Sequence, residues 1–172
     1  AEPKARTALV FTGPFEYTRQ NRYYLSALAE LLNIKLREAL RENMGGTYGV
    51  SVFPGATRDP VPSYRFSIGF GSAPERLEDL TAAALAQIDS VKRFATTPEY
   101  LNKVKEAALR ARETAIKQNG YWMAQISTFD QNGWPLDEIP NGDKLIMSLT
   151  AENLQHAAQL YLRTDNYVRV SL

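Results

Sequence analysis

The first part of the chain alternates between the period of a strand and the period of a helix. Residues 6–15 carry β-branched, aromatic and aliphatic side chains and stop at a Gly-Pro step, as a strand does. Residues 20–43 instead repeat leucine at three- and four-residue steps, which predicts an amphipathic helix ended by the following glycine pair. Residues 47–53 and 64–70 return to strand patterns, and the short proline-rich loop between them predicts an antiparallel pair.

The rest of the chain is mainly helical by the same criterion. Apolar residues recur at helical spacing, Pro74 and Pro98 suit first helical positions, and Thr97 suits an N-cap. The predicted helices cover residues 74–91, 97–118 and 121–129, with a bend at Asn119-Gly120, and a further stretch that begins at Lys144 or Thr150 and ends near residue 162. Residues 167–171 form a last short strand.

The order of these elements, β-α-β-β-α-α-α-β, predicts an α+β fold in which helices cover one face of a mainly antiparallel sheet. The 172 residues contain no internal repeat and no low-complexity tract, so we expect a single domain over residues 1–172. The chain opens with Ala1-Glu2-Pro3-Lys4, which is neither a start methionine nor a signal peptide. We therefore interpret it as a piece of a larger protein.

Composition narrows the class of protein. The formal net charge is +1, from 20 basic and 19 acidic residues without a basic block, which argues against a nucleic-acid partner. No apolar run is long enough for a membrane span. Cysteine is absent, which excludes disulfides and thiolate chemistry and fits the bacterial periplasm, although cytoplasmic proteins can also lack it. We expect a periplasmic protein, with a cytoplasmic one as the alternative.

The side chains do not supply a complete catalytic set. His156 is the only histidine, so with Glu152 it offers two ligands where a catalytic zinc usually takes three. The inverted zinc motif H-x-x-E-H, the nucleophile motif G-x-S-x-G and the phosphate-loop motif are all absent. We expect no metal site in this chain.

One segment combines residues that bind carbonyl groups. Arg41 falls in the last turn of a predicted helix, a glycine pair follows, and Tyr48 begins the next strand. A helix-to-strand corner can direct a guanidinium and a phenol, both hydrogen-bond donors, toward one place. The simpler interpretation remains open, because arginine also suits a helix C-terminus and tyrosine suits a strand.

The same segment resembles a known family. It reads Leu36-Arg37-Glu38-Ala39-Leu40-Arg41-Glu42 and runs into Gly45-Gly46-Thr47-Tyr48-Gly49-Val50. This run is similar to zinc metallopeptidases of the pitrilysin and insulin-degrading-enzyme type, the inverzincins. The resemblance extends in order through residues 21–34, 97–101, 119–122 and 149–154, and so covers nearly the whole chain.

The resemblance implies a C-terminal, zinc-free, substrate-binding domain of such a peptidase. In the family, one half carries the zinc motif and the other contributes an arginine and a tyrosine seven residues apart. By this resemblance Arg41 holds a backbone carbonyl of a peptide or small-protein substrate, and Tyr48 is the catalytic residue that polarises the scissile carbonyl. The zinc and the general base are then expected on N-terminal domains of the same polypeptide, and the fragment alone is expected to be inactive.

Two alternatives remain. The chain can belong to a non-catalytic partner subunit or scaffold with the same fold. It can also be a stand-alone α+β binding module, in which case a deep apolar pocket would lie away from Arg41 and Tyr48. RNA binding through an aromatic sheet face is disfavoured by the near-zero net charge.

Overall fold

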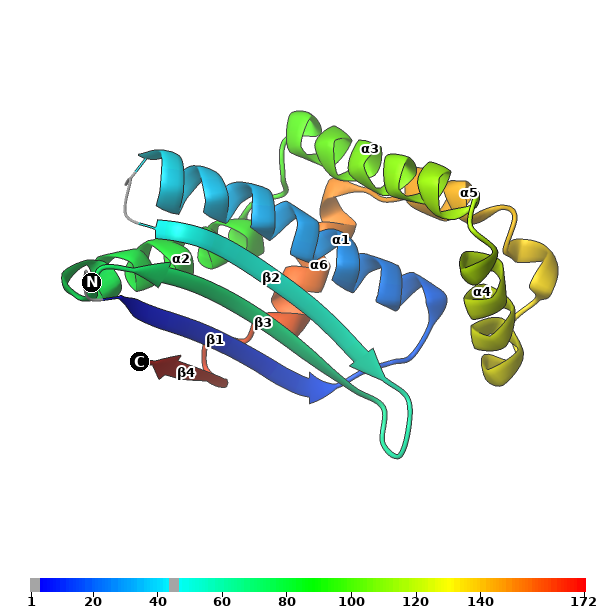
Figure 1. Cartoon of the computed structure of the whole chain (residues 1–172), viewed down its shortest axis with the longest axis horizontal. Coiled ribbons are helices and arrows are strands. Elements are labelled where there is room, and N and C mark those ends of the chain that lie inside the picture. Colours follow the sequence, from blue (N-terminus) through cyan, green and yellow to red (C-terminus); the bar gives the residue numbers. More distant parts are fainter. Residues whose placement is uncertain (1–3, 44–46) are drawn as a thin grey trace.

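A four-stranded antiparallel sheet forms one layer of the fold (Figure 1). The computed structural model describes residues 4–43 and 47–172, without the side chains of residues 42, 43 and 48. The strands are β1 (Ala5–Pro14), β2 (Thr47–Thr57), β3 (Ser63–Ser72) and β4 (Tyr167–Ser171), in the spatial order β2-β3-β1-β4. The long strands β2 and β1 both pair with β3, so β2 and the short β4 are the edges of the described sheet.

Helices form the second layer. They are α1 (Arg19–Leu36), the π-helix η1 (Arg37–Asn43), α2 (Leu77–Arg93), α3 (Pro98–Ala115), α4 (Asn119–Asn132), α5 (Gly142–Met147) and α6 (Ala151–Tyr161), with short 3-10 turns η2 (Pro74–Arg76) and η3 (Leu136–Glu138). Helices α1, α2 and α6 pack beside the sheet, whereas α3, α4 and α5 lie farther from it (Figure 1). The predicted α+β class is therefore confirmed. Among the described residues, no helix has the length and apolar character needed to cross a bilayer.

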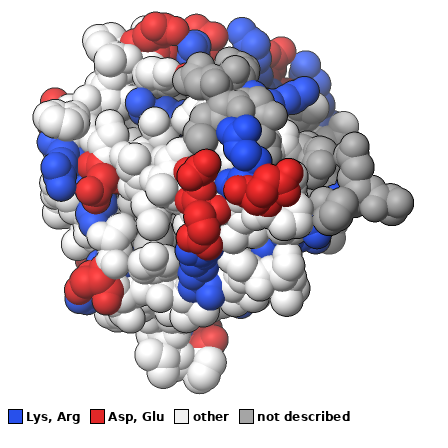
Figure 2. Space-filling view, turned by 90° about the vertical axis from the view of Figure 1, so that its left-hand side faces the viewer, with Lys and Arg blue, Asp and Glu red and all other residues white. Residues whose placement is uncertain are grey.

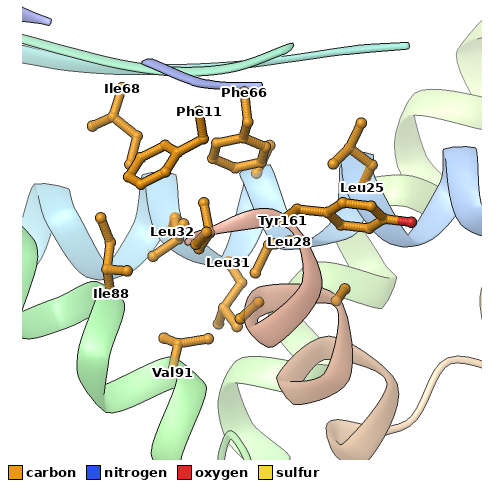
Figure 3. Packing of buried hydrophobic residues seen from close by; sticks show 14 of the residues in the cluster. Phe11, Leu25, Leu28, Leu31, Leu32, Phe66, Ile68, Ile88, Val91 and Tyr161 are labelled. Atoms are coloured by element: carbon orange, nitrogen blue, oxygen red, sulfur yellow. The ribbon is translucent and has the colours of Figure 1, made fainter. Parts of the chain in front are cut away.

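The hydrophobic core lies between the sheet and helices α1, α2 and α6 (Figure 3). Alternate residues of β1 and β3, including Phe11, Phe66 and Ile68, point from the sheet toward the helices. They meet residues at helical spacing: Leu25, Leu28, Leu31 and Leu32 of α1, Ile88 and Val91 of α2, and Tyr161 of α6. Each large apolar side chain contributes roughly 1.5–3 kcal/mol by leaving water, which fixes the orientation of α1 on the sheet.

Some element boundaries differ from the predicted ones. Residues 20–43 form an α-helix that continues as the π-helix η1, and residues 97–129 form two separate helices, α3 and α4. Both predicted starts near residues 144 and 150 are used, one by α5 and one by α6. Strand β2 continues past Phe53 to Thr57. Because β2 is an edge strand, Pro54 can stay in it although proline has no N–H to donate.

Candidate functional site

The corner between α1 and β2 holds the residues proposed from the sequence. Helix α1 passes directly into the π-helix η1, which carries Arg41 in its last turn. Leu40 is fully buried in the core, while the next residue, Arg41, is exposed. Within the described residues its guanidinium makes no hydrogen bond or ion pair. Arg41 is thus fixed at its backbone and free at its side chain, and π-helical turns are frequent at functional sites.

A polar contact from α3 holds η1 in place. The Tyr100 hydroxyl donates a hydrogen bond to the Glu38 carboxylate. This bond, and to a smaller degree burial, raises the pKa of Tyr100. Lys103 Nζ lies 4.0 Å from Glu38 Oε1 and 2.7 Å from Glu99 Oε1, and Lys35 Nζ lies 4.3 Å from the centre of the Tyr100 ring. The segment that carries Arg41 is therefore anchored both by Leu40 in the core and by Tyr100 outside it.

A bulge marks the other side of the corner. Thr47 pairs with Ser72 and Gly49 pairs with Gly71, so Tyr48 is an extra residue in β2. The Thr47 hydroxyl supports the bulge, because its oxygen lies 2.7 Å from the Gly71 carbonyl oxygen and 3.2 Å from the Gly49 nitrogen. Bulges redirect a side chain out of the regular alternation and are over-represented near active sites.

The structure places only part of the predicted pair. Arg41 is described with its side chain, whereas the side chain of Tyr48 lies outside the described part of the chain. The alternation in the sequence predicts Tyr48 on the same face as Val50 and Val52, and both valines do pack against the core. The bulge interrupts that alternation before Val50, so counting along the strand does not assign a face to Tyr48.

The surface around the corner carries both signs of charge. Figure 2 shows this end of the molecule, where basic and acidic side chains are interspersed. Such a surface has no strong field of one sign. The surface around the corner therefore offers no field that would attract a partner of one charge.

The described residues do not form a metal site. None of their histidine, aspartate and glutamate side chains gather in a group of three that could hold an ion. His156 is exposed on α6, and Glu152 lies near the start of the same helix, where hydrogen bonds lower its pKa. These residues do not fit a catalytic zinc, which needs at least three protein ligands.

Two features of the corner are not predicted by the sequence pattern. The Glu38–Tyr100 contact joins residues 62 positions apart, and no local period signals it. The bulge changes the pairing of a single residue, and Gly49 beside it is its only sign in the sequence.

Comparisons with known proteins place this fold in a family. Residues 1–108 match the family model of the peptidase M16 inactive domain, and the chain belongs to that family. This confirms the resemblance to the inactive domain of a zinc peptidase family.

Relatives show the larger setting of such domains. The chain is 28% identical over 144 residues to the chloroplastic stromal processing peptidase of Oryza sativa subsp. indica, a match that covers 82% of this chain. It spans only 11% of that relative's length.

Two solved structures share the fold. One is the ferredoxin protease FusC, an E83A mutant in complex with Arabidopsis ferredoxin, with a TM-score of 0.79 and 22% identity over 98% of this chain and 19% of FusC. The other is the periplasmic protease PqqL from Escherichia coli, with a TM-score of 0.78 and 21% identity over 99% of this chain and 19% of PqqL. At these identities the likeness concerns the fold.

Proposed function

We propose that this chain is the substrate-binding domain of a zinc endopeptidase, and that its corner at Arg41 and Tyr48 grips the peptide backbone. The observation that carries the proposal is the double irregularity of that corner. A π-helix ends on one side of it, and on the other side a bulge has Tyr48 as its extra residue. Both are backbone features that change the direction of side chains from the regular pattern of a helix or a strand. They flank the pair implied by the family resemblance.

The two residues have different roles in this proposal. The Arg41 guanidinium presents a planar fork of donors and holds a carbonyl of the substrate backbone. The Tyr48 phenol donates to the oxygen of the scissile carbonyl as negative charge develops on it. A donor aimed at such an oxyanion contributes roughly 2.7–4 kcal/mol to the stability of the transition state.

The metal and the base come from elsewhere in the proposed enzyme. The described residues do not fit a zinc site, and the family to which the chain belongs is that of the inactive domain. We place the zinc and the general base on N-terminal domains of the same polypeptide, which agrees with the greater length of the relatives.

The proposed substrate is a peptide or small protein. FusC, which has the same fold, was solved in complex with a protein, ferredoxin. For the location we propose the periplasm, because PqqL is a periplasmic protease and the chain contains no cysteine. The chloroplastic relatives show that the family is not confined to one compartment.

The activity of the isolated chain tests the division of labour. We expect the purified 172-residue chain to bind no stoichiometric zinc and to cleave no peptide, because its sequence lacks the H-x-x-E-H motif that supplies zinc ligands and the general base. Zinc is measured by atomic emission and cleavage with a quenched fluorescent peptide, and the longer protein that contains the chain serves as the positive control. Metal-dependent turnover by the chain alone would refute the proposal.

A further inference from the structure

A second candidate site lies at the opposite end of β2 from the corner. A cleft of about 640 Å³ is bordered by α1, residues 54–56 of β2, and helices α3, α4 and α5. Its walls are largely aromatic and aliphatic, and three arginines also line it: Arg19, Arg22 and Arg112. Among the described residues, no carboxylate lines the cleft. Whether each arginine already has a carboxylate partner therefore decides how much positive charge the cleft offers to a ligand.

The charge of Arg19 is already balanced by a carboxylate. Its guanidinium forms an ion pair with Glu138 of η3 and lies 4.6 Å from the centre of the Phe129 ring. Burial lowers the pKa of Arg19, as expected for a cation that packs against an aromatic wall. This residue is a part of the wall rather than a free binding group.

Arg112 is held in place without being neutralised. Its Nη2 donates to the carbonyl oxygens of Ile139, at 3.1 Å, and Pro140, at 2.7 Å, and its Nη1 donates to the Tyr121 hydroxyl. All three acceptors are uncharged. A Cβ on Gly142 would lie 2.7 Å from Nη1, so the guanidinium rests directly over that glycine. The cleft thus contains a fixed positive charge whose hydrogen-bond partners carry no compensating negative charge.

Arg22 has its donors free. It lies over the rings of Tyr17 and Trp134, at 5.3 Å and 5.8 Å from their centres, and these two rings stack at 6.2 Å. Within the described chain its guanidinium has no hydrogen bond and no carboxylate partner. Stacking on aromatic rings orients an arginine while leaving its planar fork available for a bidentate acceptor.

We propose that this cleft binds a carboxylate of an acidic peptide segment. Arg22 supplies the free fork and Arg112 the fixed charge, and both match the geometry and sign of a carboxylate. The apolar wall, which includes Leu25, Phe129 and Ile139, suits the hydrophobic side chains that flank an acidic residue in a peptide. The near-neutral chain lacks the extended basic surface that a nucleic acid would need. The inference is independent of the proposed peptidase role, because it uses none of the corner residues.

Binding of the 172-residue chain to a fluorescein-labelled peptide of alternating glutamate and leucine, followed by anisotropy, tests the inference. At low salt we expect this peptide to bind about tenfold more tightly than its glutamine counterpart, and the difference to shrink at high salt. Arg22→Gln should weaken binding of the glutamate peptide about tenfold. Arg110→Gln is the matched control, because Arg110 is exposed on α3, pairs with Glu106 and lies outside the cleft.

Arg22 is the residue to change because Arg112 also supports the loop at Ile139 and Pro140, so its loss can disturb the fold. Equal affinity for the two peptides, or equal binding by the Arg22→Gln and Arg110→Gln chains, would overturn the inference. Displacement of the peptide by a lower concentration of single-stranded DNA would also overturn it, by assigning the cleft to phosphate. None of these results bears on peptide cleavage at the corner.

Discussion

At the scale of single residues, the candidate site depends on neighbours in opposite environments. Leu40 is fully buried and Arg41 beside it is exposed, so the core holds the backbone from which the arginine projects. The apolar stripe of the helix indicates this arrangement in the sequence. The spacing of the stripe does not show that the last turns are π-helical, because Leu36 and Leu40 are four residues apart and both helix types can bury such a pair.

Tyr23 carries a testable energetic cost. Its hydroxyl is buried and has no hydrogen-bond partner among the described residues. Tyr23→Phe removes the unpaired polar atom and keeps the ring, so we expect the free energy of unfolding to rise by about 1 kcal/mol at neutral pH, measured with urea. Tyr24→Phe is the control: that hydroxyl is hydrogen-bonded to Gln20 at the surface, and its loss should not stabilise the protein. A destabilised Tyr23→Phe chain would show that the hydroxyl has a partner.

Tyr23 should also make the free energy of unfolding depend on pH in alkaline solution. Burial raises the pKa of Tyr23 to about 12 from an ordinary value of 10.0. The folded state therefore keeps this proton at a pH where the unfolded chain releases it, and unfolding becomes easier as pH rises. The free energy of unfolding is unaffected by this proton below pH 10.0 and falls as the pH rises from there toward about 12. Wild type should lose stability over this window more steeply than Tyr23→Phe, and parallel curves would contradict the assignment.

At the scale of elements, two helix starts that look alike in sequence differ in the structure. Thr150 and Asn153 form a capping box at α6, with the Asn153 nitrogen 3.1 Å from Thr150 Oγ1 and the Thr150 nitrogen 3.0 Å from Asn153 Oδ1. Thr97 occupies the N-cap of α3, as predicted, but its side chain makes no capping hydrogen bond.

Alanine substitutions compare the two caps. We expect Thr150→Ala to lower the free energy of unfolding by about 1 kcal/mol, because the hydrogen bond from the Asn153 N–H to the Thr150 hydroxyl is lost at the start of a helix that packs into the core. Thr97→Ala should cost clearly less. Equal losses in urea unfolding of the two variants would show that the side-chain bond at Thr150 contributes nothing.

The sequence predicts these elements well where a single period dominates. The alternation in β3 places Tyr64, Phe66, Ile68 and Phe70 in the core, and all four are buried. It does not predict the sheet order β2-β3-β1-β4, since pairing across the sheet depends on contacts between distant segments. The break between α3 and α4 is also only partly signalled, because Asn119-Gly120 indicates a bend without deciding whether the helix restarts.

At the scale of the whole molecule, the two candidate sites differ in how far the sequence can predict them. Arg41 and Tyr48 are seven residues apart in the chain, so a local helix-to-strand corner is enough to make them a candidate pair in the sequence. Arg22 and Arg112 come from α1 and α3 and line one cleft only after the fold has formed. No spacing rule connects such a pair, which is why the cleft emerges from the structure alone.

In the proposed enzyme, this domain contributes part of an active site whose metal lies on another domain. The most direct measurement is kcat for Tyr48→Phe in the longer peptidase that contains this chain, with Tyr24→Phe as the control. The phenol is proposed to act on charge that appears only in the transition state. We therefore expect a kcat lower by roughly 10²–10³-fold, with a smaller change in KM. An unchanged kcat would contradict it and leave Tyr48 as a residue of the strand.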